Sequence, residues 1–143
     1  MNYILLAEDD IVDQDLMINA FAKLGCEKTL KIVNDGEELL DYIFRKKKYA
    51  DLKEFPNPDL ILMDLNMPKM DGKRVLKELR DAGIHDKIIV ILTTSNDPED
   101  VRYTYQMGAK TFITKPDDLK QYDILAKEIC NYWFGIATLQ KNM

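Results

Sequence analysis

Five short apolar runs recur along the chain and predict five β-strands. The runs span Tyr3–Ala7, Leu30–Val33, Leu60–Met63, Ile88–Leu92 and Thr111–Thr114. Apolar residues follow one another in most of these runs without polar alternation, which is typical of strands covered on both faces, as in a parallel sheet.

The segments between and after the runs carry apolar residues three and four positions apart, the spacing of one helix face. These stripes consist of Met17, Phe21 and Leu24; Leu39, Leu40, Ile43 and Phe44; Val75, Leu76 and Leu79; Val101 and Tyr105; and Tyr122, Leu125, Ala126, Ile129 and Trp133. Gly25, Gly83 and Gly108 are suited to end three of the helices, and Pro98 suits the first turn of the fourth. Five successive βα units predict an α/β domain with a doubly wound, parallel five-stranded sheet.

One connection departs from the regular spacing. Residues 45–59, with the sequence RKKKYADLKEFPNPD, are basic and contain proline. We expect a solvated loop there, with a partner-contact role as the alternative.

Length and composition exclude several classes of protein. A chain of 143 residues is expected to form one domain, and a net charge of −5 argues against a dedicated nucleic-acid surface. The sequence has no apolar run of about 18 residues, so we expect no membrane span. The N-terminus lacks the basic flank of a signal peptide, which predicts a cytoplasmic protein with its two cysteines reduced.

Polar residues stand at the ends of four predicted strands. Glu8 and Asp9 follow the first, Asp64 follows the third, Thr93 follows the fourth and Lys115 follows the fifth. Because ligands of doubly wound sheets bind at the carboxyl ends of the strands, we expect these side chains to meet at one edge.

The three carboxylates of Glu8, Asp9 and Asp64 require a cation at such an edge. At about 4–6 Å and an effective dielectric constant near 20, each pair repels by roughly 3–4 kcal/mol. Oxygen ligands suit Mg²⁺, which we expect to be held by Glu8, Asp9, Asp64 and the backbone carbonyl of Asn66. The charges of three carboxylates, Lys115 and Mg²⁺ then roughly balance.

A phosphoryl group can approach Asp64 once that charge is balanced. Asp64 would act as a nucleophile that forms an acyl phosphate, while Lys115 and the Thr93 hydroxyl donate hydrogen bonds to the phosphoryl oxygens. Considered singly, Glu8 and Asp9 could be helix N-capping residues, Thr93 could be an ordinary residue at a strand end, and Lys115 could be part of a turn. Their coincidence at four strand ends favours the functional interpretation.

The segments LLAEDD, LILMDLNMPKMDG, ILTTS and FITKP, in this order, resemble the receiver domain of two-component response regulators. The resemblance implies a flavodoxin-like receiver fold for residues 1–143, with a core of about 3–133 and a short C-terminal extension, 134–143. It implies that the protein is a phosphoacceptor rather than an enzyme. Asp64 would accept a phosphoryl group from a histidine kinase by self-catalysed transfer and lose it by slow autodephosphorylation. The positions that it assigns are Glu8 and Asp9 as the acidic pair, Thr93 and Phe112 as switch residues and Lys115 as the phosphate contact. It also implies a cis Lys115–Pro116 bond.

Two departures from the common receiver pattern are informative. The pair Asp117-Asp118 stands where receivers often carry an aromatic residue. The long 45–59 connection and the ending KPDDLKQYDILAKEICNYWF look more like the stand-alone regulators that are paired with bacterial phytochrome kinases. Few residues follow Trp133, so we expect output through protein contacts.

The last helix carries more apolar surface than one sheet face can cover. Ile124, Tyr132, Phe134 and Ile136 lie outside its stripe. Large apolar patches usually mark interfaces, so we expect a homodimer with Tyr132 and Phe134 as anchors. The alternative is that these residues fold back onto their own domain.

Three other functions are alternatives to a receiver. A hydrolase of the haloacid dehalogenase type places a second aspartate where this chain has Asn66, which cannot act as a general acid. A flavodoxin-like FMN carrier needs a hydroxyl- and glycine-rich loop where this chain has AEDD. A degenerate receiver used as a scaffold would lack part of the phosphorylation set.

Overall fold

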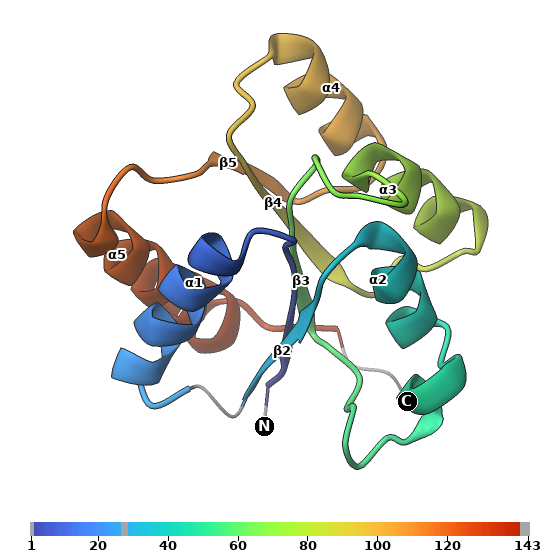
Figure 1. Cartoon of the computed structure of the whole chain (residues 1–143), viewed down its shortest axis with the longest axis horizontal. Coiled ribbons are helices and arrows are strands. Elements are labelled where there is room, and N and C mark those ends of the chain that lie inside the picture. Colours follow the sequence, from blue (N-terminus) through green and yellow to red (C-terminus); the bar gives the residue numbers. More distant parts are fainter. Residues whose placement is uncertain (1, 27–28, 141–143) are drawn as a thin grey trace.

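Five parallel strands and five α-helices alternate along the part of the chain that the computed structural model describes, residues 2–26 and 29–140 (Figure 1). The strands are β1 (Ile4–Ala7), β2 (Leu30–Val33), β3 (Leu60–Met63), β4 (Ile88–Thr93) and β5 (Thr111–Thr114). The helices are α1 (Ile11–Lys23), α2 (Gly36–Ile43), α3 (Gly72–Asp81), α4 (Pro98–Gln106) and α5 (Leu119–Ile129), with a short 3₁₀ helix, Lys47–Ala50, and a π-helical segment, Cys130–Ile136.

The strands form one sheet in the order β2-β1-β3-β4-β5, and every pair is parallel. The chain therefore reverses its winding direction after β2, so helices cover both faces. This confirms the predicted doubly wound α/β fold.

Alternate residues of the central strands face two separate cores. Leu5, Ile61 and Ile89 face the core under α2 and α3, whereas Leu6 and Leu62 face the core under α1 and α5. Figure 1 shows α1 and α5 together on one side of the sheet, with α2 and α3 on the other. Since strands buried on both faces need no polar positions, this burial explains their unbroken apolar runs.

The connection between α2 and β3, residues 45–59, is exposed over most of its length, as predicted, but an aromatic cluster that the sequence analysis did not predict anchors it to the domain. The ring of Tyr49, only 3% exposed, packs against Tyr42 and Phe55 with centroids 4.9 and 4.8 Å away. The guanidinium of Arg45 donates hydrogen bonds to the carbonyl oxygens of Tyr49 and Phe55. The aromatic residues do not follow a helix or strand period, and the basic residues between them conceal the cluster in the sequence.

Candidate functional site

The hydrogen-bond ladder of the sheet continues one residue beyond its strands and aligns the polar residues there. The N–H of Glu8 donates to the last carbonyl of β2, and the N–H of Asp64 donates to the last carbonyl of β1, both at 3.1 Å. The N–H of Lys115 donates to the Thr93 carbonyl oxygen at 2.7 Å. Residues from four separate strand ends are thereby held at one edge.

Lys115 lies at the centre of this edge and contacts three carboxylates. Its Nζ is 2.6 Å from Glu8 Oε1, 2.7 Å from Asp13 Oδ2 and 2.8 Å from Asp64 Oδ2. The side chains of Lys115, Glu8 and Asp64 are 7%, 4% and 7% exposed. An ammonium group has three donors, so each donor of Lys115 is used by a carboxylate.

The carboxylates of Glu8, Asp9 and Asp64 form a group suited to a divalent cation. Each offers an oxygen, and these oxygens lie within 4.8 Å of one another. Asp9 is exposed, which leaves the group open to solvent on one side. Asn66 is next to it, because its backbone N–H donates to Asp64 Oδ1 at 3.2 Å. Oxygen donors of this kind fit hard cations such as Mg²⁺.

The pKa values of Glu8 and Lys115 reflect the burial of several carboxylates around one ammonium group. Burial raises the pKa of Glu8 from 4.5 to about 7, against the hydrogen bond from Lys115, which lowers it. Burial by itself would lower the pKa of Lys115, but hydrogen bonds from its ammonium to Asp13, Asp64 and Glu8 outweigh burial and raise it. Lys115 therefore stays charged, and one ammonium is shared by more carboxylates than it can neutralise.

The loop after β3 folds tightly against Asp64 because of Gly72. A Cβ on this glycine would lie 2.7 Å from the Asp64 carbonyl oxygen and 2.9 Å from Leu65 Cα, closer than side chains approach. Asp71 caps the following helix, accepting a hydrogen bond from the Arg74 N–H at 2.9 Å. The sequence DG thus begins α3 and supports the backbone of Asp64.

The two predicted switch residues lie on neighbouring strands. Thr93, at the end of β4, is fully buried, and its hydroxyl accepts a hydrogen bond from the Ser95 N–H at 3.5 Å. Phe112 on β5 is half-buried, and its backbone N–H donates to the Tyr105 hydroxyl at 3.1 Å. Tyr105 is 47% exposed, so it does not belong to a buried stripe of α4, as its spacing predicted.

Three site residues were missed by the sequence reasoning. Asp13 reaches Lys115 from the first turn of α1, and Gln14 Nε2 donates to the Glu8 carbonyl oxygen and to Asn34 Oδ1. Asp10, not Glu8 or Asp9, caps α1 by accepting from the N–H groups of the two residues at 12 and 13. The sequence did contain one signal for these residues: α1 begins directly after Asp10, so its first turn must lie close to the carboxyl ends of the strands.

The connection into α5 differs from the expectation drawn from the resemblance. The Lys115–Pro116 bond is trans, so the prediction of a cis bond is wrong; the trans form is the more stable by about 0.5–1 kcal/mol. Asp118 caps α5 by accepting from the Gln121 N–H at 2.9 Å. Asp118 of the acidic pair therefore begins the helix.

The two predicted interface anchors have different surroundings. Tyr132 is 50% exposed, whereas Phe134 is half-buried and packs against the core under α1 and α5. Ile124 and Ile136 are 45% and 76% exposed. The alternative interpretation, in which these residues fold back onto their own domain, therefore applies to Phe134. The side chains of Ile124, Tyr132 and Ile136 remain exposed to solvent.

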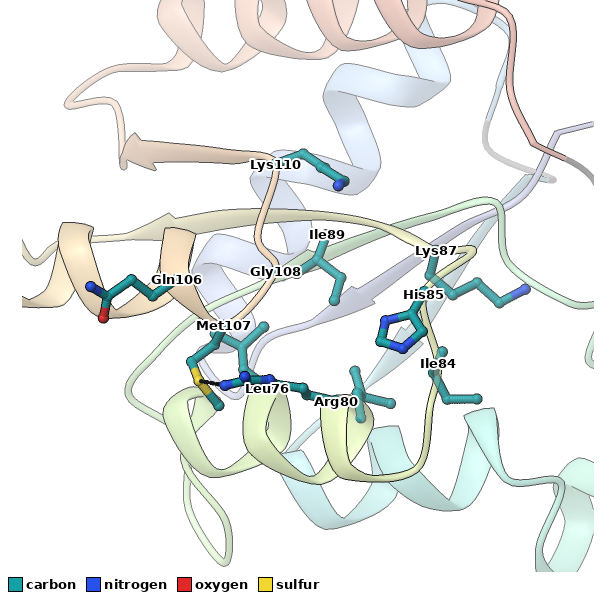
Figure 2. A pocket seen from close by; sticks show the side chains of 11 residues that line it. Leu76, Arg80, Ile84, His85, Lys87, Ile89, Gln106, Met107, Gly108 and Lys110 are labelled. Atoms are coloured by element: carbon teal, nitrogen blue, oxygen red, sulfur yellow. Dashed lines mark hydrogen bonds between the residues drawn. The ribbon is translucent and has the colours of Figure 1, made fainter.

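A cavity of about 230 Å³ lies at the far end of β4 from Thr93, between α3 and the segment after α4 (Figure 2). Leu76, Ile84 and Ile89 line it, and Arg80 Nη1 donates to Met107 Sδ at 3.3 Å. No residue of the carboxylate edge lines this cavity. The candidate site is a buried ion cluster at the sheet edge rather than a ligand cavity.

Comparison with known proteins gives consistent matches. Residues 4–126 match the family model described as response regulator receiver domain. The chain is 32% identical over 137 residues to response regulator Rcp1 of Synechocystis, with 95% of this chain and 91% of Rcp1 covered.

Two solved structures cover nearly the whole chain. The phosphorylated cyanobacterial phytochrome response regulator RcpA superimposes with a TM-score of 0.88 at 34% identity, covering 98% of this chain and 99% of RcpA. The Mn²⁺-bound form of Rcp1 gives 0.84 at 30% identity, covering 99% of this chain and 100% of that chain. Within the described residues, every helix is too short or too polar to cross a membrane.

Proposed function

The chain belongs to the family of response regulator receiver domains of two-component signalling, and on this premise we propose that Asp64 accepts a phosphoryl group from a histidine kinase in a Mg²⁺-dependent reaction. The observation that carries the proposal is the contact of 2.8 Å between Lys115 Nζ and Asp64 Oδ2, beside the oxygens of Glu8 and Asp9. A buried aspartate beside a lysine and two further carboxylates is suited to receive an anion only if a cation accompanies it.

The chain's own residues account for most of the transfer. A carboxylate oxygen of Asp64 forms a bond to phosphorus while the bond from phosphorus to the phosphohistidine nitrogen of the kinase breaks. Lys115 donates a hydrogen bond to a phosphoryl oxygen and so compensates part of its charge. A divalent cation held by Glu8, Asp9, Asp64 and the Asn66 carbonyl would supply the remaining positive charge.

Intact-protein mass spectrometry tests this function. Incubation with a small acyl phosphate and Mg²⁺ should add the mass of one phosphoryl group, and chelation of the metal should prevent it. Asp64→Asn should remain unlabelled, whereas Asp41→Asn, an aspartate on α2 away from the carboxylate edge, should label like the wild type. Equal labelling of Asp64→Asn would refute the assignment.

Thr93 and Phe112 are the proposed switch. Phosphorylation of Asp64 should draw the Thr93 hydroxyl toward the phosphoryl group, and Phe112 should then turn inward into the vacated space. Their positions on the adjacent strands β4 and β5 support this coupling. A crystal structure of the beryllofluoride complex with both side chains unmoved would contradict it.

The partner kinase is proposed to be of the phytochrome type. RcpA, a phytochrome response regulator, is similar to this chain over nearly its full length, which supports the proposal. Phosphotransfer from each histidine kinase of the source organism identifies the partner. A phytochrome kinase should transfer fastest, and preference for a kinase without a phytochrome module would overturn the assignment.

A homodimer is the proposed means of output. Two grooves, of about 580 and 390 Å³, adjoin β5 and α5, and both are lined by Ile113 and Leu125. Ile124 lines the first groove and Tyr132 lines the second, so each groove has an exposed apolar side chain in its wall. Such a surface suits a second copy, with the exposed Tyr132 as the main anchor and the half-buried Phe134 as the second.

A further inference from the structure

Asp13 differs from the other two carboxylates that contact Lys115. Glu8 and Asp64 belong to the group of oxygens that can hold a divalent cation, a group that among the described residues contains Glu8, Asp9 and Asp64. Asp13 lies outside that group, yet its Oδ2 is 2.7 Å from Lys115 Nζ. A cation held by this group would engage Glu8 and Asp64 and would leave Asp13 free to keep its contact with Lys115.

We propose that Asp13 is a positioning residue for phosphoryl transfer, which holds the Lys115 ammonium beside Asp64 while the other two carboxylates change partners. This inference rests on the proposed function of Asp64 as phosphoacceptor. Lys115 has four side-chain torsions, and its ammonium needs a fixed contact to stay in one orientation. Once Asp64 carries a phosphoryl group, one donor of Lys115 turns to that group, and Asp13 keeps a second donor fixed.

The position of Asp13 on α1 is rigid enough for this role. Asp10 caps the helix through the N–H groups of residues 12 and 13, at 2.8 and 3.3 Å. Gln14, the next residue, ties the same turn to the Glu8 carbonyl and to Asn34. The Asp13 side chain is 24% exposed, so it contacts Lys115 from the outer side of the site.

The rate of phosphorylation by excess acyl phosphate and Mg²⁺ tests the proposal. Asp13→Asn should slow the reaction about five- to tenfold, because the uncharged amide oxygen of Asn accepts a weaker hydrogen bond from the ammonium than a carboxylate does. Asp15→Asn removes the same charge from an exposed position of the same helix and should stay within about twofold of the wild type. An unchanged rate in Asp13→Asn would overturn the proposal.

A double-mutant cycle separates positioning from a structural role. If Asp13 acts through Lys115, Asp13→Asn should have no further effect on the rate in a Lys115→Met background, whereas independent effects would multiply. Multiplying effects would overturn the proposal. Affinity for Mn²⁺ alone should change in Asp13→Asn by no more than about threefold, since Asp13 is not among the candidate ligands; a larger loss would make Asp13 part of the metal site instead.

Folding and the parent proposal are checked separately. If Asp13→Asn loses its cooperative thermal transition, Asp13→Glu replaces it in the same cycle, because it keeps the charge but displaces it by one methylene group. An unlabelled wild type would refute the proposed function of Asp64. A labelled wild type with equally fast Asp13 variants would refute only the role of Asp13.

Discussion

The carboxyl edge of the sheet and the surface along β5 and α5 depart from ordinary protein architecture in opposite ways. At the edge, charged groups are buried: Lys115 is 7% exposed and surrounded by three carboxylates. Along β5 and α5, apolar groups are exposed: Tyr132 is 50% exposed and Ile136 is 76% exposed. Buried charge and exposed apolar surface both cost stability, and such departures are typical of functional sites.

The two regions are joined by one short segment of chain. Ile113 on β5 lines both grooves of the apolar surface, and Lys115 follows the same strand directly. When the Lys115 ammonium exchanges a carboxylate for a phosphoryl group, the change therefore takes place at the end of a strand that borders the proposed interface. This proximity explains how an ionic event at the edge could alter contacts on the apolar surface.

Removing the ammonium should produce the largest change. Lys115→Met leaves the buried carboxylates of Glu8 and Asp64 without their partner, and we expect the free energy of unfolding to fall by about 3 kcal/mol or more at pH 7 without metal. Addition of Mg²⁺ should restore a large part of it. Urea denaturation measures both quantities.

Lys23→Met is the matched control for that experiment. Lys23 Nζ is 2.7 Å from Asp123 Oδ2, a contact as short as those of Lys115, but the side chains are 55% and 33% exposed. Its loss should cost less than about 1 kcal/mol, because exposed ion pairs contribute little. Equal losses in the two variants would show that burial is not what makes the carboxyl edge distinct.

The next effect is a dependence of stability on pH. Glu8 has a pKa of about 7 in the folded protein, above its value of 4.5 in the unfolded chain, chiefly because of burial. The folded state therefore binds the extra proton, and this favourable contribution is complete below pH 4.5 and lost as the pH rises through about 7. Metal-free protein should lose up to about 3 kcal/mol from this group between those limits.

Urea denaturation across pH 4.5–8 tests that dependence, with and without Mg²⁺. Glu8→Gln should flatten the curve, while Glu37→Gln, an exposed residue of α2, should leave it unchanged. Mg²⁺ should bind more tightly as the pH rises, since the cation displaces the proton. A flat curve for the wild type would mean that Glu8 is ionised throughout.

The smallest effect concerns the apolar surface. Tyr132→Asp should weaken self-association about tenfold, because it places a charge in the proposed contact. Leu52→Asp changes an apolar residue that is 56% exposed and distant in sequence from that surface, and it should leave association unchanged. Sedimentation at micromolar concentrations, with and without acyl phosphate, measures the difference. A wild type that is monomeric in both states would leave the surface without a dimer role.

The sheet and the three central residues of the carboxyl edge could be predicted from the sequence for a physical reason. Continuous apolar strands in alternation with helices permit few topologies, and a parallel sheet brings all its carboxyl ends to one edge. The side chains of Glu8, Asp64 and Lys115 follow directly after strands, so the backbone ladder alone places them together.

Asp13 and the aromatic cluster of residues 42, 49 and 55 could not be predicted in the same way. Asp13 reads as an ordinary acidic residue of a first helical turn, and its contact depends on how α1 rotates over the sheet. Tyr49 lies in a short 3₁₀ helix directly after four basic residues, 45–48, so no periodic pattern reveals its packing. Both depend on side-chain packing rather than on sequence period.

Chemical identification of the acceptor residue tests the central claim most directly. Borohydride reduces an aspartyl phosphate to homoserine, and peptide mass spectrometry then locates the altered residue. After treatment with acyl phosphate, homoserine should appear at position 64, only when Mg²⁺ is present, and not when the protein is treated with borohydride alone. Homoserine at position 9 or 13, or its absence from every position of a protein that binds Mg²⁺, would contradict the assignment of Asp64 as the phosphoacceptor.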